Sequence, residues 1–192
     1  MNHVALEGVT DDRIGDESER RRLTGPLGTT DLALSHYRLA PGDGFPGGLH
    51  AHTDQAEVFV VLAGVATFET PDAPGGEVTV SAGEAIRFGP GEFQSGWNRG
   101  DTDCVALALG APRDTEDTRI PVACPDCGHG DLRLDVAGDT PALVCPDCDA
   151  AHIPEPCPTC GDGELLARLG PDAEPIAVCE TCGDEFATPP LG

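Results

Sequence analysis

The stretch that decides the fold of this protein is residues 44–64, which read GFPGGLHAHTDQAEVFVVLAG. It places His50, His52 and Glu57 between a glycine-rich turn and an apolar run typical of a β-strand. Because His50 and His52 are two residues apart, both imidazoles point to the same face of an extended strand. Two imidazoles and a carboxylate on one face form a three-ligand set suited to Fe, Mn, Ni or Zn. The sequence therefore predicts a divalent-metal centre at this point.

The regions around this stretch predict further β-structure. Short β-rich runs, separated by glycine and proline turns, cover residues 31–40, 57–70, 77–80, 84–88 and 103–109. Such runs without helical periodicity favour an antiparallel sandwich or barrel. Residues 1–25 carry little apolar periodicity and include three consecutive arginines, so we expect a solvated or frayed leader there.

The spacing within residues 44–64 resembles the first conserved motif of the cupin family. The motif runs from Gly44 through the two histidines and Glu57 to Gly64, with every interval intact. A second cupin motif follows, with its positions at Gly83, Gly89, Pro90, Gly91, Gln94 and Asn98. The resemblance implies a mainly β protein whose N-terminal part is an antiparallel jelly-roll barrel of about residues 25–112, with the metal in its lumen.

The second motif departs from the family at its metal ligand. Cupins normally place a histidine where this chain has Gln94, and a proline where it has Gly89. An amide oxygen is a weaker and harder donor than imidazole. Gln94 is therefore a poor fourth ligand, a hydrogen-bonding group for a substrate, or a lumen residue without metal contact. Further candidates to act as acids, anion clamps or packing residues are His36, Tyr37, Arg87, Glu92 and Trp97.

The C-terminal part carries four Cys-x-x-Cys pairs. Two such pairs supply a tetrahedral four-thiolate zinc site, and a protein without signs of secretion has little use for a disulfide framework. The two halves repeat with a period of 33 residues, which favours two sequential zinc ribbons over an interleaved pairing. The first zinc is assigned to Cys124, Cys127, Cys145 and Cys148, and the second to Cys157, Cys160, Cys179 and Cys182. His129 and His152 flank these pairs as substitute ligands, and Cys104 is expected to be a buried thiol.

Four segments follow from these signals. Residues 1–112 are the barrel with its N-terminal extension, 113–120 a polar linker, 121–153 the first zinc ribbon and 154–192 the second. The expected cofactors are two structural zinc ions and one further divalent metal, Fe, Mn, Ni or Zn, in the barrel.

The charge of the chain describes its solvent more than its partner. There are 34 acidic against 11 basic residues, a formal charge of −23, and no lysine. Dispersed acids of this kind resemble the proteins of halophilic archaea, because molar salt shortens the Debye length to about 3 Å and screens their repulsion. No apolar run approaches the roughly 18 residues of a membrane span, so we expect a cytoplasmic protein with no membrane contact.

Two classes of function fit the resemblance, since the cupin fold alone does not choose a reaction. In the first, the barrel is an enzyme, a metal-dependent cupin oxygenase or isomerase, and the metal binds a small oxygen-rich carboxylate, sugar or anionic ligand. In the second, the barrel is a ligand sensor or regulatory protein whose ribbons contact a partner. Each ribbon has one arginine between its cysteine pairs, Arg133 or Arg168, which favours a protein over a nucleic acid. A homodimer is expected.

Overall fold

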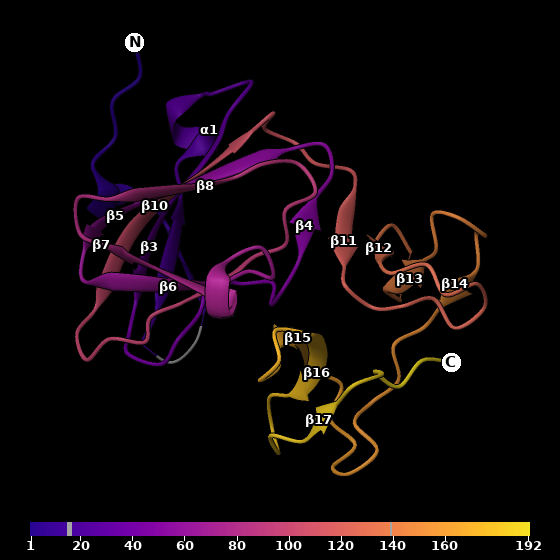
Figure 1. Ribbon diagram of the computed structural model, residues 1–192. Coiled ribbons are helices and arrows are strands. Elements are labelled where there is room, and N and C mark those ends of the chain that lie inside the picture. Colours follow the sequence, from indigo (N-terminus) through magenta and orange to yellow (C-terminus); the bar gives the residue numbers. More distant parts are fainter. Residues whose placement is uncertain (15–16, 139) are drawn as a thin grey trace.

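The computed structural model describes residues 1–14, 17–138 and 140–192, so Gly15, Asp16 and Asp139 lie outside the described part. The described residues are mainly β, as predicted, with three short helices: η1 (Leu6–Gly8), α1 (Thr24–Leu27) and η2 (Pro74–Gly76). Figure 1 shows a barrel built from the first half of the chain and two smaller units built from the second.

The barrel consists of two antiparallel sheets that enclose one core. The larger sheet contains, in spatial order, β1 (Asp11–Arg13), β2 (Glu19–Arg22), β3 (Ala33–Leu39), β10 (Cys104–Ala111), β5 (Ala56–Ala63) and β8 (Ala85–Phe88). The smaller sheet contains β7 (Glu77–Ser81), β6 (Val65–Glu69) and β9 (Ser95–Trp97). Most of these strands coincide with the β-rich runs expected from the sequence.

Aromatic rings fill much of the barrel. Phe45 packs at 5.0 Å from both Tyr37 and Phe59, measured between ring centroids, and Phe68 and Phe88 complete the cluster. Burial of such rings is the main source of stability for a domain with few aromatics. Gly64, which closes the first motif, takes a positive φ of 71° between β5 and β6, and a side chain there would collide with the carbonyl of Asp103.

The expectation of a solvated or frayed leader is wrong for residues 11–13 and 19–22, whereas residues 1–10 are mostly exposed and form no strand. Strands β1 and β2 extend the larger sheet, and the arginine triplet lies in β2, which pairs with β3. Ion pairs stabilise this charged strand: Arg20 and Arg22 both reach Asp12, at 3.2 and 2.9 Å. Hydrophobic periodicity misses such a strand, because its partners are charges on neighbouring strands.

A third sheet runs from the barrel into the first cysteine-rich unit. Its strands are, in order, β4 (Ala51–His52), β11 (Thr118–Ile120), β12 (Leu132–Asp135), β13 (Ala142–Val144) and β14 (Ala151–His152). In Figure 1, β4 and β11 lie side by side between the barrel and this unit. The segment 113–120, expected to be a polar linker, thus ends in a strand that hydrogen-bonds to both sides.

The second cysteine-rich unit rests on the barrel. It contains β15 (Leu165–Leu169), β16 (Pro175–Cys179) and β17 (Glu185–Phe186). The backbone N–H of Leu49 donates to the carbonyl of Ala167 at 2.6 Å. Beside this contact, the guanidinium of Arg168 lies 4.0 Å from the ring centroid of Trp97 and donates to Glu69 at 3.2 Å. A cation–π contact and an ion pair, both made by Arg168, and one backbone hydrogen bond therefore hold this unit against the barrel.

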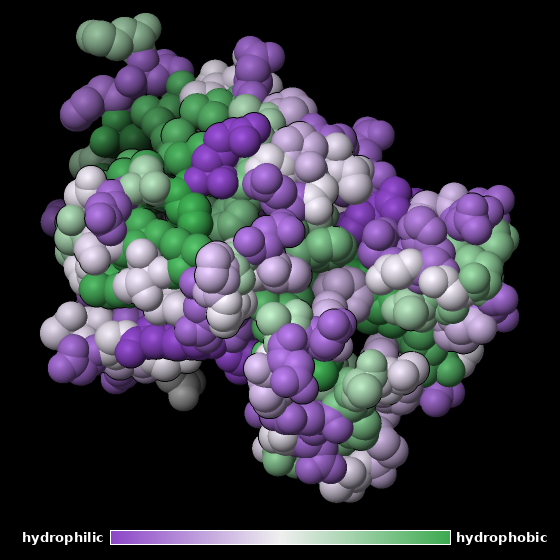
Figure 2. Space-filling view, in the orientation of Figure 1, coloured by the Kyte–Doolittle hydropathy of each residue, from purple (hydrophilic) through white to green (hydrophobic). Residues whose placement is uncertain are grey.

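Figure 2 shows hydrophilic residues on every unit, a large hydrophobic area over the barrel and smaller hydrophobic areas on the two cysteine-rich units. Among the described residues, no helix has the length and apolar character needed to cross a membrane.

Candidate metal centres

The predicted ligands of the barrel come together in space. His50 and His52 approach Glu57 from β4 and the turn before it, and one ligand atom from each of the three lies within 4.8 Å of the others. The two imidazole rings are 5.0 Å apart between centroids, and His52 Nε2 lies 3.7 Å from Glu57 Oε2. All three residues are half-buried. This arrangement can hold one divalent ion and leaves coordination positions for other donors.

The hydrogen bonds of the histidines favour ligation through Nε2. His50 Nδ1 lies 2.9 Å from the carbonyl oxygen of Gly48, which only accepts, so Nδ1 carries the proton and Nε2 presents its lone pair to the centre. His52 Nδ1 faces hydroxyl groups on the other side, Thr118 Oγ1 at 3.1 Å and Thr115 Oγ1 at 3.3 Å. Burial lowers the pKa of His52, opposed by the charge of Glu57, and this favours the neutral ring that a metal requires.

Gln94 lies directly beside these groups, in the buried strand region before β9. Its Nε2 donates to Glu57 Oε2 at 2.9 Å and lies 3.5 Å from His50 Nε2. Its Oε1 is buried and, among the described residues, has no hydrogen-bond partner. An unsatisfied buried carbonyl oxygen is costly, and a cation would satisfy it. The donor set therefore fits a divalent metal, with Gln94 able to offer a fourth, neutral ligand.

The lumen next to this cluster is narrow. Its volume is about 50 Å³. Of the candidate ligands, His50, Glu57 and Gln94 line it, together with Tyr37, Phe45, Phe59 and Ser95. Burial raises the pKa of Tyr37, with hydrogen bonding to Arg20 acting in the opposite direction, so the phenol stays protonated at neutral pH. Tyr37 is thus the candidate acid or hydrogen-bond donor inside the lumen.

The other residues singled out from the sequence lie elsewhere. Arg87 is exposed on β8 and so does not serve as an anion clamp in the lumen. Glu92 is exposed and accepts the N–H of Gly89 in a turn. His36 precedes Tyr37 on β3 and therefore faces the opposite side of the sheet, while Trp97 packs under Arg168. Asn98 is fully buried and bonds the carbonyls of Leu39 and Thr102, a purely structural role.

The eight remaining cysteines form two separate clusters, grouped sequentially. Within the first cluster the Sγ–Sγ distances are 3.7 Å for Cys124 to Cys148 and 3.5 Å for Cys127 to Cys145. Within the second they are 3.7 Å for Cys157 to Cys182 and 3.5 Å for Cys160 to Cys179. A tetrahedron with Zn–S bonds of about 2.3 Å has edges of about 3.8 Å, whereas a disulfide requires about 2.05 Å. The clusters therefore have the size of four-thiolate zinc sites.

The turns that carry the cysteines repeat one geometry. In each, the fourth residue after the first cysteine donates its N–H back to that cysteine's carbonyl, at 2.8–3.1 Å. Backbone N–H groups also donate hydrogen bonds to the sulfurs. The N–H of Cys160, and to a smaller extent that of Thr159, lowers the pKa of Cys157 to about 7 despite desolvation. In contrast, although the N–H of Asp184 acts to lower it, desolvation and neighbouring thiols raise the pKa of Cys182 to about 12. Four clustered thiolates thus need a cation.

Of the two flanking histidines, only His152 approaches a cluster. It is buried, and its Nε2 lies 3.7 Å from Cys124 Sγ. His129 Nε2 instead lies 3.8 Å from Asp131. Cys104 is fully buried in the barrel core, and burial raises its pKa to about 11, as expected for an inert thiol.

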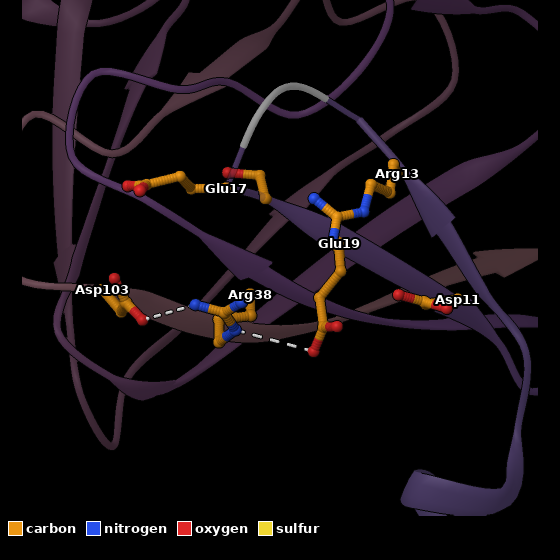
Figure 3. A pocket seen from close by; sticks show the side chains of 7 residues that line it. Asp11, Arg13, Glu17, Glu19, Arg38 and Asp103 are labelled. Atoms are coloured by element: carbon orange, nitrogen blue, oxygen red, sulfur yellow. Dashed lines mark hydrogen bonds and ion pairs between the residues drawn. The ribbon is translucent and has the colours of Figure 1, made fainter.

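A larger cleft of about 420 Å³ lies on the outer face of β1–β3. Figure 3 shows Arg38 between Asp103 and Glu19, with ion pairs of 2.9 and 3.6 Å. Arg38 follows Tyr37 on β3, so this cleft and the lumen lie on opposite faces of the sheet. Two arginines face four carboxylates in this cleft, and we assign it no ligand.

Sequence reasoning missed several residues whose hydrogen-bond partners are far away along the chain. Thr115 and Thr118 face His52 from the expected linker. Glu69 is buried and accepts hydrogen bonds from Ser95, Arg99 and Arg168. Nothing local in the sequence marks these residues, because their roles depend on partners 26 to 99 positions away.

Comparison with known proteins agrees with the barrel. Residues 35–110 match the family model described as Cupin domain. A predicted oxalate decarboxylase from Thermotoga maritima is 25% identical, with a TM-score of 0.50 over 57% of this chain and 98% of its own. A polyketide cyclase from Streptomyces resistomycificus is 23% identical, with a TM-score of 0.54 over 66% of this chain and 89% of its own.

A sugar phosphate isomerase of the cupin superfamily from Silicibacter pomeroyi is 19% identical, with a TM-score of 0.52 over 79% of this chain and 92% of its own. The search of curated proteins found no match. The two least identical structures support the fold only. Residues 35–110 thus match the Cupin domain model, and the barrel shares its fold with these structures.

Proposed function

We propose that the cupin domain holds a divalent metal through His50, His52 and Glu57, with Gln94 as a neutral fourth donor, and that this centre binds a small carboxylate. The observation that carries the proposal is the convergence of the three ligand atoms within 4.8 Å next to the amide of Gln94. The Nε2 of this amide donates to Glu57, and its buried Oε1 has no hydrogen-bond partner among the described residues. When bound, the metal supplies Lewis-acid polarisation of a ligand oxygen.

The volume of the lumen supports a small ligand. A water molecule needs about 10–15 Å³ of such space, so 50 Å³ admits only a few non-hydrogen atoms. A two- or three-carbon carboxylate approaches this size, whereas a sugar phosphate exceeds it several-fold. The likeness to a predicted oxalate decarboxylase points the same way.

The side chains of the lumen can orient such a ligand. Tyr37 keeps its proton, because burial raises its pKa, and can donate a hydrogen bond to a carboxylate oxygen. Phe45 and Phe59 close the lumen with apolar surface and exclude bulk water. In the absence of a lining arginine or lysine among the described residues, the negative charge of the ligand falls to the metal.

For the two cysteine clusters we propose structural zinc. Units of about 30 residues cannot bury enough apolar surface to fold alone, so the metal contributes their folding free energy.

A second candidate function is ligand sensing. The second ribbon contacts the loop before the histidines, where the N–H of Leu49 donates to the carbonyl of Ala167. The first ribbon reaches His52 indirectly, through Thr118 on strand β11, which pairs with β12. A change at the metal could therefore reach the ribbons and alter their contact with a protein partner. Beyond this, we infer a cytoplasmic homodimer adapted to molar salt. Light scattering in 0.2 and 2 M KCl tests the molar mass of the dimer and its dependence on salt.

The deciding experiment is elemental analysis joined to calorimetry. Purified protein is expected to contain two zinc ions and one further divalent metal per chain, and oxalate should bind with measurable heat. The His50→Ala variant should lose the further metal and oxalate binding while keeping both zinc ions. His3→Ala, an exposed histidine outside the cluster, is the matched control.

Retention of three metals by His50→Ala would contradict the assignment of ligands. Glucose 6-phosphate provides the size control: binding of this sugar phosphate in place of oxalate would overturn the proposed ligand class while leaving the metal site intact.

A further inference from the structure

The two histidines of the barrel centre are held by different parts of the molecule. His50 bonds the carbonyl of Gly48, two residues away in its own loop. His52 bonds Thr118 and Thr115, which lie 66 and 63 positions further along the chain, outside the cupin match. One ligand is thus oriented locally, and the other by the segment that leads into the first ribbon.

The contacts of Thr115 determine which way the hydrogen bond runs. Its hydroxyl donates to Asp54 Oδ1 at 2.5 Å, and the same carboxylate accepts the N–H of Glu116 at 2.7 Å. Because the only hydroxyl hydrogen of Thr115 is donated to Asp54, Thr115 Oγ1 can only accept a hydrogen bond from His52. Nδ1 of His52 therefore carries the proton, and Nε2 presents its lone pair toward Glu57.

Thr118 reaches His52 because of strand pairing. In the antiparallel pair of β4 and β11, Thr118 lies directly opposite His52, and opposed residues project on the same face. The next residue, Arg119, lies opposite Ala51 on β4 and opposite Arg133 on β12. Strand β11 is thus shared between the barrel and the first ribbon.

Side-chain contacts reinforce this shared strand on the ribbon side. Arg119 Nη1 donates to Asp131 Oδ1 at 2.9 Å, next to the turn of the first cysteine pair, and its other nitrogens reach Asp117. Asp117 in turn accepts the backbone N–H of Thr53, one residue after His52. A continuous set of contacts therefore connects His52 to the fold of the first ribbon.

We propose that Thr118 and Thr115 are positioning residues that hold His52 in its metal-binding tautomer, and that the folded first ribbon maintains them through β11. The proposal rests on the metal site described under the proposed function. Its consequence is linkage: zinc in the first ribbon strengthens metal binding in the barrel, and the barrel metal strengthens zinc binding by the same factor.

The first test uses Thr118→Val, which keeps the shape and removes the hydroxyl, and Thr118→Ser, which restores it. Zinc-loaded full-length protein is titrated with Mn²⁺, and free Mn²⁺ is followed by electron paramagnetic resonance. Mn²⁺ is a weak competitor for thiolate sites, so the zinc clusters stay intact. Thr118→Val should weaken Mn²⁺ binding about 10- to 100-fold, and Thr118→Ser should recover most of this loss.

Thr53→Val is the matched control, because its hydroxyl contacts Asp117 and not His52. Nitrogen-15 shifts of the His52 ring give a readout that needs no metal. The wild type should show a protonated Nδ1, and the double variant Thr115→Val/Thr118→Val, which lacks both hydroxyl acceptors, a mixture of tautomers. A tautomer unchanged in this double variant overturns the positioning role, whether or not the barrel binds Mn²⁺. Failure of the wild type to bind Mn²⁺ would instead overturn the proposed metal site.

The linkage is tested with a pair of equivalent variants, Cys127→Ser in the first ribbon and Cys160→Ser in the second, 33 residues apart. Both cysteines are exposed. Cys127→Ser should weaken Mn²⁺ binding in the barrel by about tenfold, comparable to the loss of a hydrogen bond to a metal-binding histidine. Cys160→Ser should change it little. Equal losses, or none from Cys127→Ser, would overturn the route through β11.

Discussion

The barrel centre and the cysteine clusters are two contrasting ways to build a metal site. Each cluster takes its four ligands from two tight turns within about 25 residues, and its Sγ–Sγ distances already match a zinc tetrahedron. The barrel centre takes its three candidate ligands from residues 50–57, but depends on Gln94 and on two threonines from beyond the barrel. Under the proposal of structural zinc the clusters need their metal to fold, whereas the barrel has an aromatic core of its own.

The largest effect expected from this contrast is the loss of a whole ribbon. Cys145→Ser removes a buried zinc ligand of the first cluster, and the zinc-binding energy of such units is about 10–16 kcal/mol. Zinc content should fall from two to one per chain, and the first ribbon should become sensitive to protease. Cys104→Ala, which changes a buried cysteine outside both clusters, should keep two zinc ions. Full zinc content in Cys145→Ser would refute the closed cluster.

The second effect concerns the docking of the second ribbon. The carboxylate of Glu69 is 4% exposed and pairs with Arg99 and Arg168. Glu69→Ala leaves both guanidiniums without this partner and should cost about 2–4 kcal/mol, reduced from the value for a fully buried pair because the arginines reach solvent. Hydrogen exchange at β15 should increase. Glu77→Ala, which removes an exposed partner of Arg99, is the control and should leave β15 protected.

The third effect sharpens the difference in donor chemistry. Gln94→His supplies the imidazole that cupins usually have at this position, and should tighten Mn²⁺ binding about tenfold, or about 1.4 kcal/mol. Gln94→Leu removes the amide at similar size and should weaken binding. If Mn²⁺ affinity is the same in both variants and in the wild type, Gln94 has no contact with the metal.

The smallest effect lies within one cysteine turn. Three of the four turns place glycine at the residue with positive φ, but the second turn of the first ribbon has Asp149 there, at 59°. Asp149→Gly should relieve backbone strain and stabilise the ribbon by about 0.5 kcal/mol, measured by zinc competition. Gly183→Ala at the equivalent position should destabilise the second ribbon by about 1 kcal/mol. Destabilisation of the first ribbon by Asp149→Gly, or stabilisation of the second ribbon by the alanine variant, would contradict backbone strain at Asp149.

The sequence predicted those parts whose cause is local. The clustering of His50, His52 and Glu57 follows from their spacing on an extended chain, and that of the cysteine pairs from turns of four residues. The barrel strands with alternating apolar residues were predicted too, such as β5 and β6.

The parts that could not be predicted depend on long-range pairing. Strand β2 consists of charged residues and exists because β1 and β3 supply partners on both sides. Thr118 became a neighbour of His52 only through the pairing of β4 with β11. Arg87 was a plausible lumen residue until the register of β8 against β5 placed it outside. In each case one residue of register shift reverses the result.

Strand β11 also has a consequence for how the protein can be divided. It hydrogen-bonds to β4 on one edge and to β12 on the other, so the barrel and the first ribbon have no clean border between them. A truncation after Ala111 would uncover the edge of β4, and a truncation after Ile120 would uncover the edge of β11. Uncovered edges pair with other molecules and promote aggregation. An ancestral fusion that acquired this shared strand would therefore be difficult to reverse by simple gene fission.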